Sequence, residues 1–445
     1  MLPGDKGARR LKQAAWLSPL QLVFRLGEAL LPLLLARRFG GTHDMDTFTL
    51  AWTLCWFFAA GVFSLYRDSS LVPSVIGAAH AGIDLPHVRG SLLKQGVTVG
   101  AALACIFAAI ASIAPRLFGD HHVVLPWQLI LPLALYIAAL CIRTLCGGLL
   151  QAEGRFIAIS AFGGAGMLCA VLLILYLRPP LAHLGWLIAG GELVATACSL
   201  IFLAKVAPLT LANLPDATAV ARLFWRKGGP ESFGRLITRA NPAVDQLMVA
   251  NIAGGITLVR LGSDLAGVGA QILQLTVLPL LLTHLSWRFH AGKFSQHRRE
   301  TSVTCMVAGA AVALFSLAAW FARTWLVRHL FGSSAMSEID ITRLAQVFGF
   351  QLLGAPFMAM QLVLVRSLTS AGHGGFLFPL GIFNIGANFM LNLLLLPLMG
   401  LAGVALSTSL VTALVFGLLW AKMLVFWRRN SDTVQTAAST PAAAT

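Results

Sequence analysis

The sequence predicts an all-α polytopic membrane protein, with about twelve transmembrane helices in two six-helix lobes related by a parallel pseudo-repeat. Three observations lead to this prediction: an apolar composition, a one-sided distribution of basic residues, and a similarity between the two halves of the chain. Of the 445 residues, 58% are hydrophobic and 11% are charged, and the mean hydropathy is +0.80. Soluble domains carry about 25% charged residues. The composition therefore excludes an ordinary soluble enzyme and a nucleic-acid-binding module, and it indicates a bilayer as the solvent.

The apolar segments are long enough to cross the hydrocarbon core as helices, which takes about 20 residues each. We expect helices at residues 18–38, 46–66, 92–114, 124–147, 156–177, 181–204, 234–253, 264–287, 301–323, 344–369, 375–397 and 400–424. This divides the chain into a polar N-terminus (1–17), an N-terminal lobe (18–204), a basic linker (205–233), a C-terminal lobe (234–424) and a tail (425–445). The tail is poor in apolar residues, so we expect it to be disordered.

The basic residues are concentrated on one side of this predicted topology. The net charge is +15, and most of the Lys and Arg fall in the N-terminus, the even-numbered connections and the tail. Basic runs occur at residues 222–235, 288–299 and 422–429. Cytoplasmic loops carry such an excess of Lys and Arg. The pattern predicts that both termini are cytoplasmic, and it accounts for much of the net charge without a nucleic-acid partner.

The second half of the chain resembles the first. Residues 156–194 and 376–411 each contain a helix of small residues, a helix end at Pro, a tight turn and a Gly/Ala-rich helix ending in Leu-Val. The segment Ala36–Gly41 resembles Ala250–Gly255. Two halves of six helices share one orientation, so they would be related by an axis along the membrane normal. A transport site is then expected between them, near the middle of the membrane.

Ionisable residues inside spans are costly and are candidate functional residues. The predicted central cavity takes substrate-binding residues from the first, second and seventh helices: Arg25, Glu28, Asp46, Arg239 and Asn241. Asp245 and Glu192 are candidates for ion coupling. Arginines bind phosphate through charge-assisted hydrogen bonds, so one interpretation is an anionic substrate. The other interpretation is that Arg25–Glu28 and Arg239–Asp245 are ion pairs that neutralise each other and hold helices together, without binding a substrate.

Sequence motifs for other chemistry are missing. The chain has no Walker A sequence, no HExxH and no GxSxG, and its cysteines are scattered without a CxxC. Two adjacent histidines in a loop do not make a metal site. We therefore expect a protein that is not an enzyme and that holds no cofactor and no metal.

Several segments resemble the MurJ (MviN) lipid II flippase family of the multidrug/oligosaccharidyl-lipid/polysaccharide (MOP) exporter superfamily. The first helices read Arg25-Leu26-Gly27, then Ala36 to Gly40, Asp46-Thr47-Phe48 and Val72-Pro73. The seventh and eighth match at Asn241, Asp245, Ala250, Gly254-Gly255, Leu278-Pro279 and Leu285-Ser286. The last two match best, at Asn388 to Pro397 and at Gly400 to Ser409. The resemblance implies a flippase for a lipid-linked saccharide in the bacterial inner membrane.

The chain departs from this family at three further cavity arginines, whose places hold Leu31, Ala59 and Asp264. It also stops at about twelve helices, where the family has two more. The implied partners are a polyprenyl-pyrophosphate-linked saccharide, membrane lipids and cell-envelope assembly proteins. Two alternatives stay open: a cation-coupled multidrug antiporter of the same superfamily, and a non-transporting scaffold of a cell-envelope assembly complex.

Overall fold

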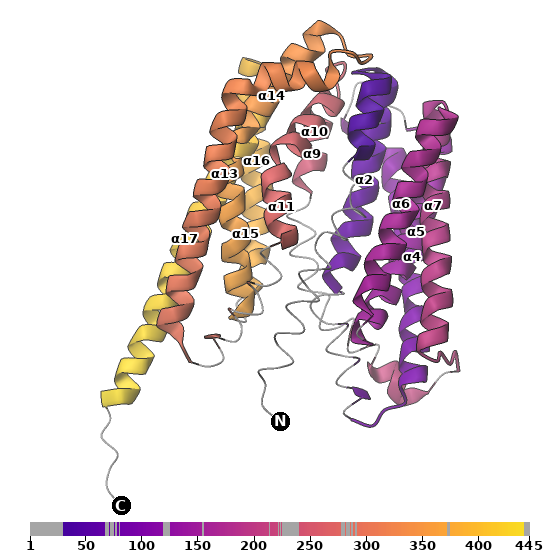
Figure 1. Cartoon of the computed structure of the whole chain (residues 1–445), viewed down its shortest axis with the longest axis vertical. Helices are drawn as coiled ribbons and strands as arrows, with labels where there is room; N and C mark the ends of the chain where they lie inside the picture. Colours follow the sequence, from indigo (N-terminus) through magenta and orange to yellow (C-terminus); the bar gives the residue numbers. More distant parts are fainter. Residues whose placement is uncertain are drawn as a thin grey trace, which may run out of the picture. The chain divides into compact units, whose positions relative to one another are not determined.

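The computed structural model describes residues 30–66, 81–118, 125–153, 155–212, 214–220, 240–276, 292–371 and 374–439, with a few single positions between them. Almost all of these residues are helical (Figure 1). Six helices in this part are long and apolar enough to cross a membrane, and a bent pair makes a seventh. The prediction of an all-α membrane protein is confirmed.

Contacts divide the chain into two compact units. The first holds Met1–Thr257 and Ser333–Ser337, and the second holds Leu258–Gly332 and Glu338–Thr445. The predicted lobe boundary at 205–233 comes from the sequence repeat, whereas the contact boundary falls inside α10 (Gly255–Ala266).

In the first unit, α5 (Trp127–Ala152) packs against α2 (His43–Tyr66), α4 (Leu85–Phe118), α6 (Phe156–Leu177) and α7 (Leu181–Val206) (Figure 1). An aromatic contact lies in the α2–α5 interface, where the rings of Trp52 and Tyr136 are 5.3 Å apart. The backbones of α6 and α7 approach closely at Gly166 and Gly191. A Cβ on Gly166 would lie 2.6 Å from the Gly191 carbonyl oxygen. Small residues permit such close packing between membrane helices.

In the second unit, α13 (Phe294–Phe331) packs against α14 (Glu338–Leu352) and α15 (Ala355–Ser370). The last helix, α17 (Leu401–Ser439), packs against α14, α15 and α16 (Leu377–Met399) (Figure 1). The core between α15 and α17 contains fully buried Val363, Leu368 and Met423. The apolar side chains of this unit are thus buried where its helices pack against one another.

Several helix ends differ from the predicted ones. α4 and α13 extend beyond the predicted 92–114 and 301–323 because a helix continues through charged turns outside its apolar stretch. The predicted helix at 344–369 is two helices, α14 and α15, bent by 43°. Pro356 in the first turn of α15 explains the break, since proline lacks the N–H that would continue the helix. α17 continues to Ser439, into the segment predicted as a disordered tail.

The predicted helices 234–253 and 264–287 differ most. In the described part of the first, α9 (Asn241–Met248) is followed by turns up to Gly254. In place of the second, α10 begins at Gly255 and is followed after Gly267 by α11 (Val268–Thr276). Of the predicted first helix, residues 30–39 are described and are helical.

Candidate functional site

The predicted site residues fall into two groups. Arg25, Glu28 and Arg239 lie outside the residues that the structure describes. Asp46, Asn241, Asp245 and Glu192 lie inside the first unit, on α2, α9 and α7. Asp46, Asp245 and Glu192 are buried, at 2%, 5% and 3% exposure. A buried carboxylate needs hydrogen-bond donors or a cation beside it, so the neighbours of each residue indicate its role.

Asp46 lies in the first turn of α2 and caps the first turn of α10. Its Oδ1 accepts hydrogen bonds from the Thr257 backbone N–H at 2.8 Å and from the Thr257 hydroxyl at 2.7 Å. Thr257 is the third residue of α10, so its N–H has no partner within the helix. A carboxylate is favoured at a helix N-terminus because it satisfies such N–H groups and complements the helix dipole. The hydrogen bonds join the first half of the sequence repeat to the second.

Two similar turns bring Asp46 and Thr257 together. Gly40 and Gly254, which correspond in the repeat, both adopt a positive φ, of 64° and 73°, a conformation that favours glycine. A Cβ on Gly254 would lie 2.9 Å from the Gly41 carbonyl oxygen, so the two turns pack directly against each other. The resemblance of Ala36–Gly41 to Ala250–Gly255 thus corresponds to a shared local structure.

A third segment packs onto the first of these turns. The Ala335 N–H donates to the Arg37 carbonyl oxygen at 3.0 Å, and the Arg37 guanidinium donates to the Ser333 hydroxyl at 3.1 Å. A Cβ on Gly40 would lie 2.5 Å from the Ala335 carbonyl oxygen. We call residues 37–41, Gly254 and residues 333–336 the turn cluster. It holds three segments that are far apart in the sequence.

Glu192 on α7 forms an ion pair with Arg143 on α5. The Arg143 Nε donates to Glu192 Oε1 at 2.5 Å, and the two side chains are 17% and 3% exposed. One turn away along α7, the Thr196 hydroxyl donates to the Ala139 carbonyl oxygen at 3.0 Å. Because Glu192 is buried, loss of Arg143 would remove the cation that its carboxylate faces in a low-dielectric environment. The sequence analysis identified Glu192 but missed Arg143 as its partner.

The short helix α9 presents a row of polar side chains. Asn241 and Asp245 are one turn apart on the same face, and Gln246 follows at 1% exposure. The Asn241 Oδ1 and the Gln246 Oε1 are buried and have no hydrogen-bond donor among the described residues. α9 packs against α2 and α4. Oxygens in this state are ready acceptors for the hydroxyl or amide groups of a polar ligand.

The three positions where the resembled family carries further arginines have distinct environments. Leu31 and Ala59 are buried, each at 1% exposure. Asp264 on α10 accepts a hydrogen bond from the Arg260 Nε at 2.9 Å, one turn earlier. A cation is therefore present on this helix, but a carboxylate neutralises it. Among the described residues, no group of three or more His, Cys, Asp and Glu is placed to hold a metal ion.

Comparisons with known proteins agree with this fold. A sequence profile described as "Lipid II flippase MurJ" matches residues 91–434. A sequence comparison with curated proteins gives no significant match.

Among solved structures, the lipid II flippase MurJ in an inward closed conformation matches with a TM-score of 0.73 and 15% identity, covering 93% of this chain and 87% of that one. An inward-facing multidrug resistance transporter of the MATE family matches with a TM-score of 0.71 and 13% identity, covering 95% of this chain and 96% of that one. A MOP-superfamily transporter from Pyrococcus furiosus matches at 0.68 and 13% identity, covering 94% and 96%.

The structural matches show a MOP-like fold. Their sequence identities of 13–15% support a statement about the fold alone. The profile match spans well over half of the chain, including all of the second sequence half except its last residues. This agrees with the apolar spans, and the protein is an integral membrane protein. The chain belongs to the MurJ family of lipid II flippases.

Proposed function

We propose that this protein moves a polyprenyl-pyrophosphate-linked saccharide, with lipid II as the first candidate, across the bacterial inner membrane by alternating access. The observation that carries the proposal is the family match over residues 91–434, on a chain with the corresponding fold. A charged sugar head group cannot cross hydrocarbon unaided, because its polar groups would lose their hydrogen bonds to water. The protein supplies those bonds and leaves the lipid tail in the bilayer.

The substrate's phosphates are proposed to bind Arg25 and Arg239. Arginine forms paired, charge-assisted hydrogen bonds with phosphate oxygens and keeps its charge inside a membrane protein. Glu28 would orient Arg25, one turn away on the same predicted helix. The sugar and peptide part would use acceptors on α9, where the Asn241 Oδ1 and the Gln246 Oε1 lack donors in the described structure. These oxygens support the proposal, since a saccharide offers many hydroxyl donors.

Asp46 is proposed to act on the conformational cycle. Its hydrogen bonds to Thr257 join α2 to the start of α10 beside the turn cluster. Alternating access requires the two sequence halves to separate on one side of the membrane in one state and to close in the other. Breaking the two hydrogen bonds of Asp46 would accompany opening on the side of the turn cluster. Asp46 would thus set the equilibrium between the two states and also line the cavity once it is released.

Ion coupling is assigned to Asp245 and Glu192. Transport against a gradient needs a group that binds an ion or proton in one state and releases it in the other. Glu192 could take up a proton only when its hydrogen bond with Arg143 opens. Asp245 lies on α9, beside the oxygens proposed for substrate binding. We propose that both termini are cytoplasmic, as the basic residues indicate, and that cell-envelope assembly proteins are further partners.

A cation-coupled multidrug antiporter is the second candidate function. Two observations favour it: the MATE-family transporter is covered over 96% of its length, and buried Leu31 and Ala59 replace two of the expected arginines. A drug antiporter would bind cations with carboxylates, and it would not need Arg25 or Arg239.

Complementation of two depletion strains tests the substrate. One strain lacks its lipid II flippase and the other lacks its polysaccharide-unit flippase. We expect the wild-type protein to restore growth of the first strain. Rescue of only the second strain would move the substrate to another glycan. Rescue of neither strain, with the protein shown to be in the membrane, would contradict flipping and favour the antiporter or a scaffold.

A further inference from the structure

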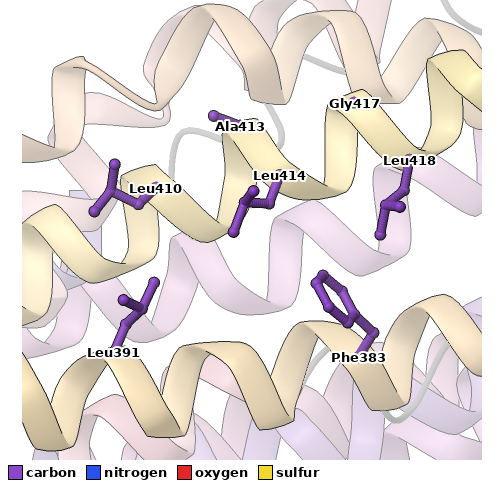
Figure 2. A pocket seen from close by; sticks show the side chains of 7 residues that line it. All are labelled: Phe383, Leu391, Leu410, Ala413, Leu414, Gly417 and Leu418. Atoms are coloured by element: carbon purple, nitrogen blue, oxygen red, sulfur yellow. The ribbon is translucent and has the colours of Figure 1, made fainter.

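An apolar groove runs between α16 and α17. Figure 2 shows the side chains of Phe383 and Leu391 on α16 facing those of α17 across an open channel. Its volume is about 580 Å³. The lining consists of Phe383, Leu391, Leu410, Ala413, Leu414, Gly417 and Leu418. All seven side chains are hydrocarbon or hydrogen, so the groove offers no hydrogen bond to a ligand.

The groove opens away from the core of its unit. Phe383, Leu414 and Leu418 are 42%, 51% and 41% exposed, although they lie within the apolar part of two helices long enough to span a membrane. Side chains exposed at this depth face lipid, since the bilayer has no water in its core. The natural content of the groove is therefore a hydrocarbon chain.

Gly417 lies on the groove wall without a packing partner. A Cβ added there would meet no atom within 4 Å. Glycine inside a helix is about 1 kcal/mol less favourable than alanine, and in membrane helices it usually allows another chain to come close. No described part of this protein lies within 4 Å of that added Cβ, so the groove is wide enough at Gly417 to admit an acyl chain.

A cation lies at one end of the groove. Lys422 follows Leu418 by one turn of α17, and its Nζ lies 5.1 Å from the centre of the Phe376 ring. Phe376 precedes Phe383 by two turns, at the start of α16. Residues spaced by four or seven positions share a helix face, so Lys422 and Phe376 extend the two walls of the groove. The ring holds the ammonium by a cation–π contact and leaves its N–H groups able to donate to an anion.

We propose that this groove binds one acyl chain of an anionic glycerophospholipid, whose phosphate contacts Lys422. The apolar walls match an acyl chain, and the single cation at the end of the groove matches a single negative head group. In the proposed orientation this end lies in the cytoplasmic leaflet, where anionic lipids attract basic residues. A zwitterionic lipid would fit the walls equally well but would gain less from Lys422. None of the residues that line the groove is among those proposed for substrate binding.

Lipid binding to the purified, delipidated full-length protein tests the proposal. Native mass spectrometry would follow titration with phosphatidylglycerol, with phosphatidylcholine and with undecaprenyl phosphate. We expect the wild type to prefer phosphatidylglycerol over phosphatidylcholine. Lys422→Gln should reduce this preference about fivefold, the contribution of one Lys near a membrane surface. Lys205→Gln, which removes an exposed lysine near the end of α7, should leave it unchanged.

Gly417→Leu should fill the groove and lower the binding of both glycerophospholipids at the first site at least tenfold. Gly386→Leu is the matched control, because Gly386 lies on α16, also has open space around its Cβ and does not line the groove. The thermal midpoint of each variant in detergent would show that it is folded. Equal binding by Gly417→Leu and Gly386→Leu would overturn the groove, and no loss of preference in Lys422→Gln would overturn the role of the cation. Stronger binding of undecaprenyl phosphate than of phosphatidylglycerol would assign the groove to the prenyl chain and overturn the proposed occupant.

Discussion

Replacement of Arg143 by alanine is expected to lower the free energy of unfolding by about 3–5 kcal/mol, the usual cost of removing one partner from a buried ion pair. Glu192 would remain at 3% exposure with its main counter-charge gone. Thermal or denaturant unfolding in detergent measures the effect. Glu192→Ala should cost less, because the arginine that it leaves without this partner is only partly buried, at 17% exposure.

The pair Arg328–Glu338 provides the matched control. Its nitrogen–oxygen distance is 2.8 Å, and its side chains are 60% and 70% exposed. Arg328→Ala should therefore cost no more than about 1 kcal/mol. If Arg143→Ala and Arg328→Ala lowered the free energy of unfolding equally, the ion pair between Arg143 and buried Glu192 would not contribute the stability that we expect.

Replacement of both partners separates stability from transport. The double variant Arg143→Met with Glu192→Leu removes both charges and fills the space with apolar side chains, which is often neutral for stability. We expect it to fold. Loss of transport in this folded variant would support ion coupling through Glu192, whereas full transport would assign the pair to structure alone.

Replacement of Asp46 by alanine is the second large effect that we expect. The substitution removes two hydrogen bonds to a carboxylate, and bonds to charged groups contribute about 1.5–3 kcal/mol. A loss of at least about 2 kcal/mol corresponds to at least about a 30-fold shift in an equilibrium constant, since 1.4 kcal/mol is a factor of ten. Amide hydrogen exchange at the start of α10, including Thr257, should therefore be at least about 30-fold faster.

Two variants control this measurement. Asp44 lies in the same first turn of α2 but is exposed, so Asp44→Ala should leave exchange at Thr257 unchanged. Asp46→Asn keeps an acceptor oxygen without the charge and should give an intermediate rate. Unchanged exchange at Thr257 in Asp46→Ala would show that Asp46 does not hold α10, and the proposed control of opening by Asp46 would then fail.

The fold class could be predicted because a membrane constrains the sequence strongly. Every span must be apolar and helical, and basic residues accumulate on one side. Helix ends were harder to predict where the cause lies outside the helix. The start of α10 was placed at 264, yet α10 begins at Gly255 and is capped by Asp46, 211 residues before Thr257 in the sequence. A helix end that depends on such a distant carboxylate leaves little local signal.

The sequence selects candidate site residues by their type, but it does not show which side chains they contact. Asp46 and Glu192 were selected because acids inside spans are costly, and both are buried and hydrogen-bonded. Arg143 and Thr257 were missed as their partners, because both pairs form between separate helices, and the pattern of one helix does not show which side chain of another it will meet. The matching glycines Gly40 and Gly254 were used only as evidence of a repeat. They also mark two turns that pack together, and this signal could have predicted that Asp46 lies close to Thr257.

The central claim is that this chain flips a pyrophosphate-linked lipid with the help of Arg25. Its most direct test measures lipid II translocation in proteoliposomes containing wild type, Arg25→Ala, or the control Arg299→Ala, which removes an exposed arginine of α13. We predict that wild type and Arg299→Ala translocate lipid II well above the rate of protein-free vesicles. Arg25→Ala should be at least about tenfold slower, because a hydrogen bond to a charged group contributes about 1.5–3 kcal/mol. Translocation by wild type no faster than in empty vesicles, or equal rates for wild type and Arg25→Ala, would contradict the claim.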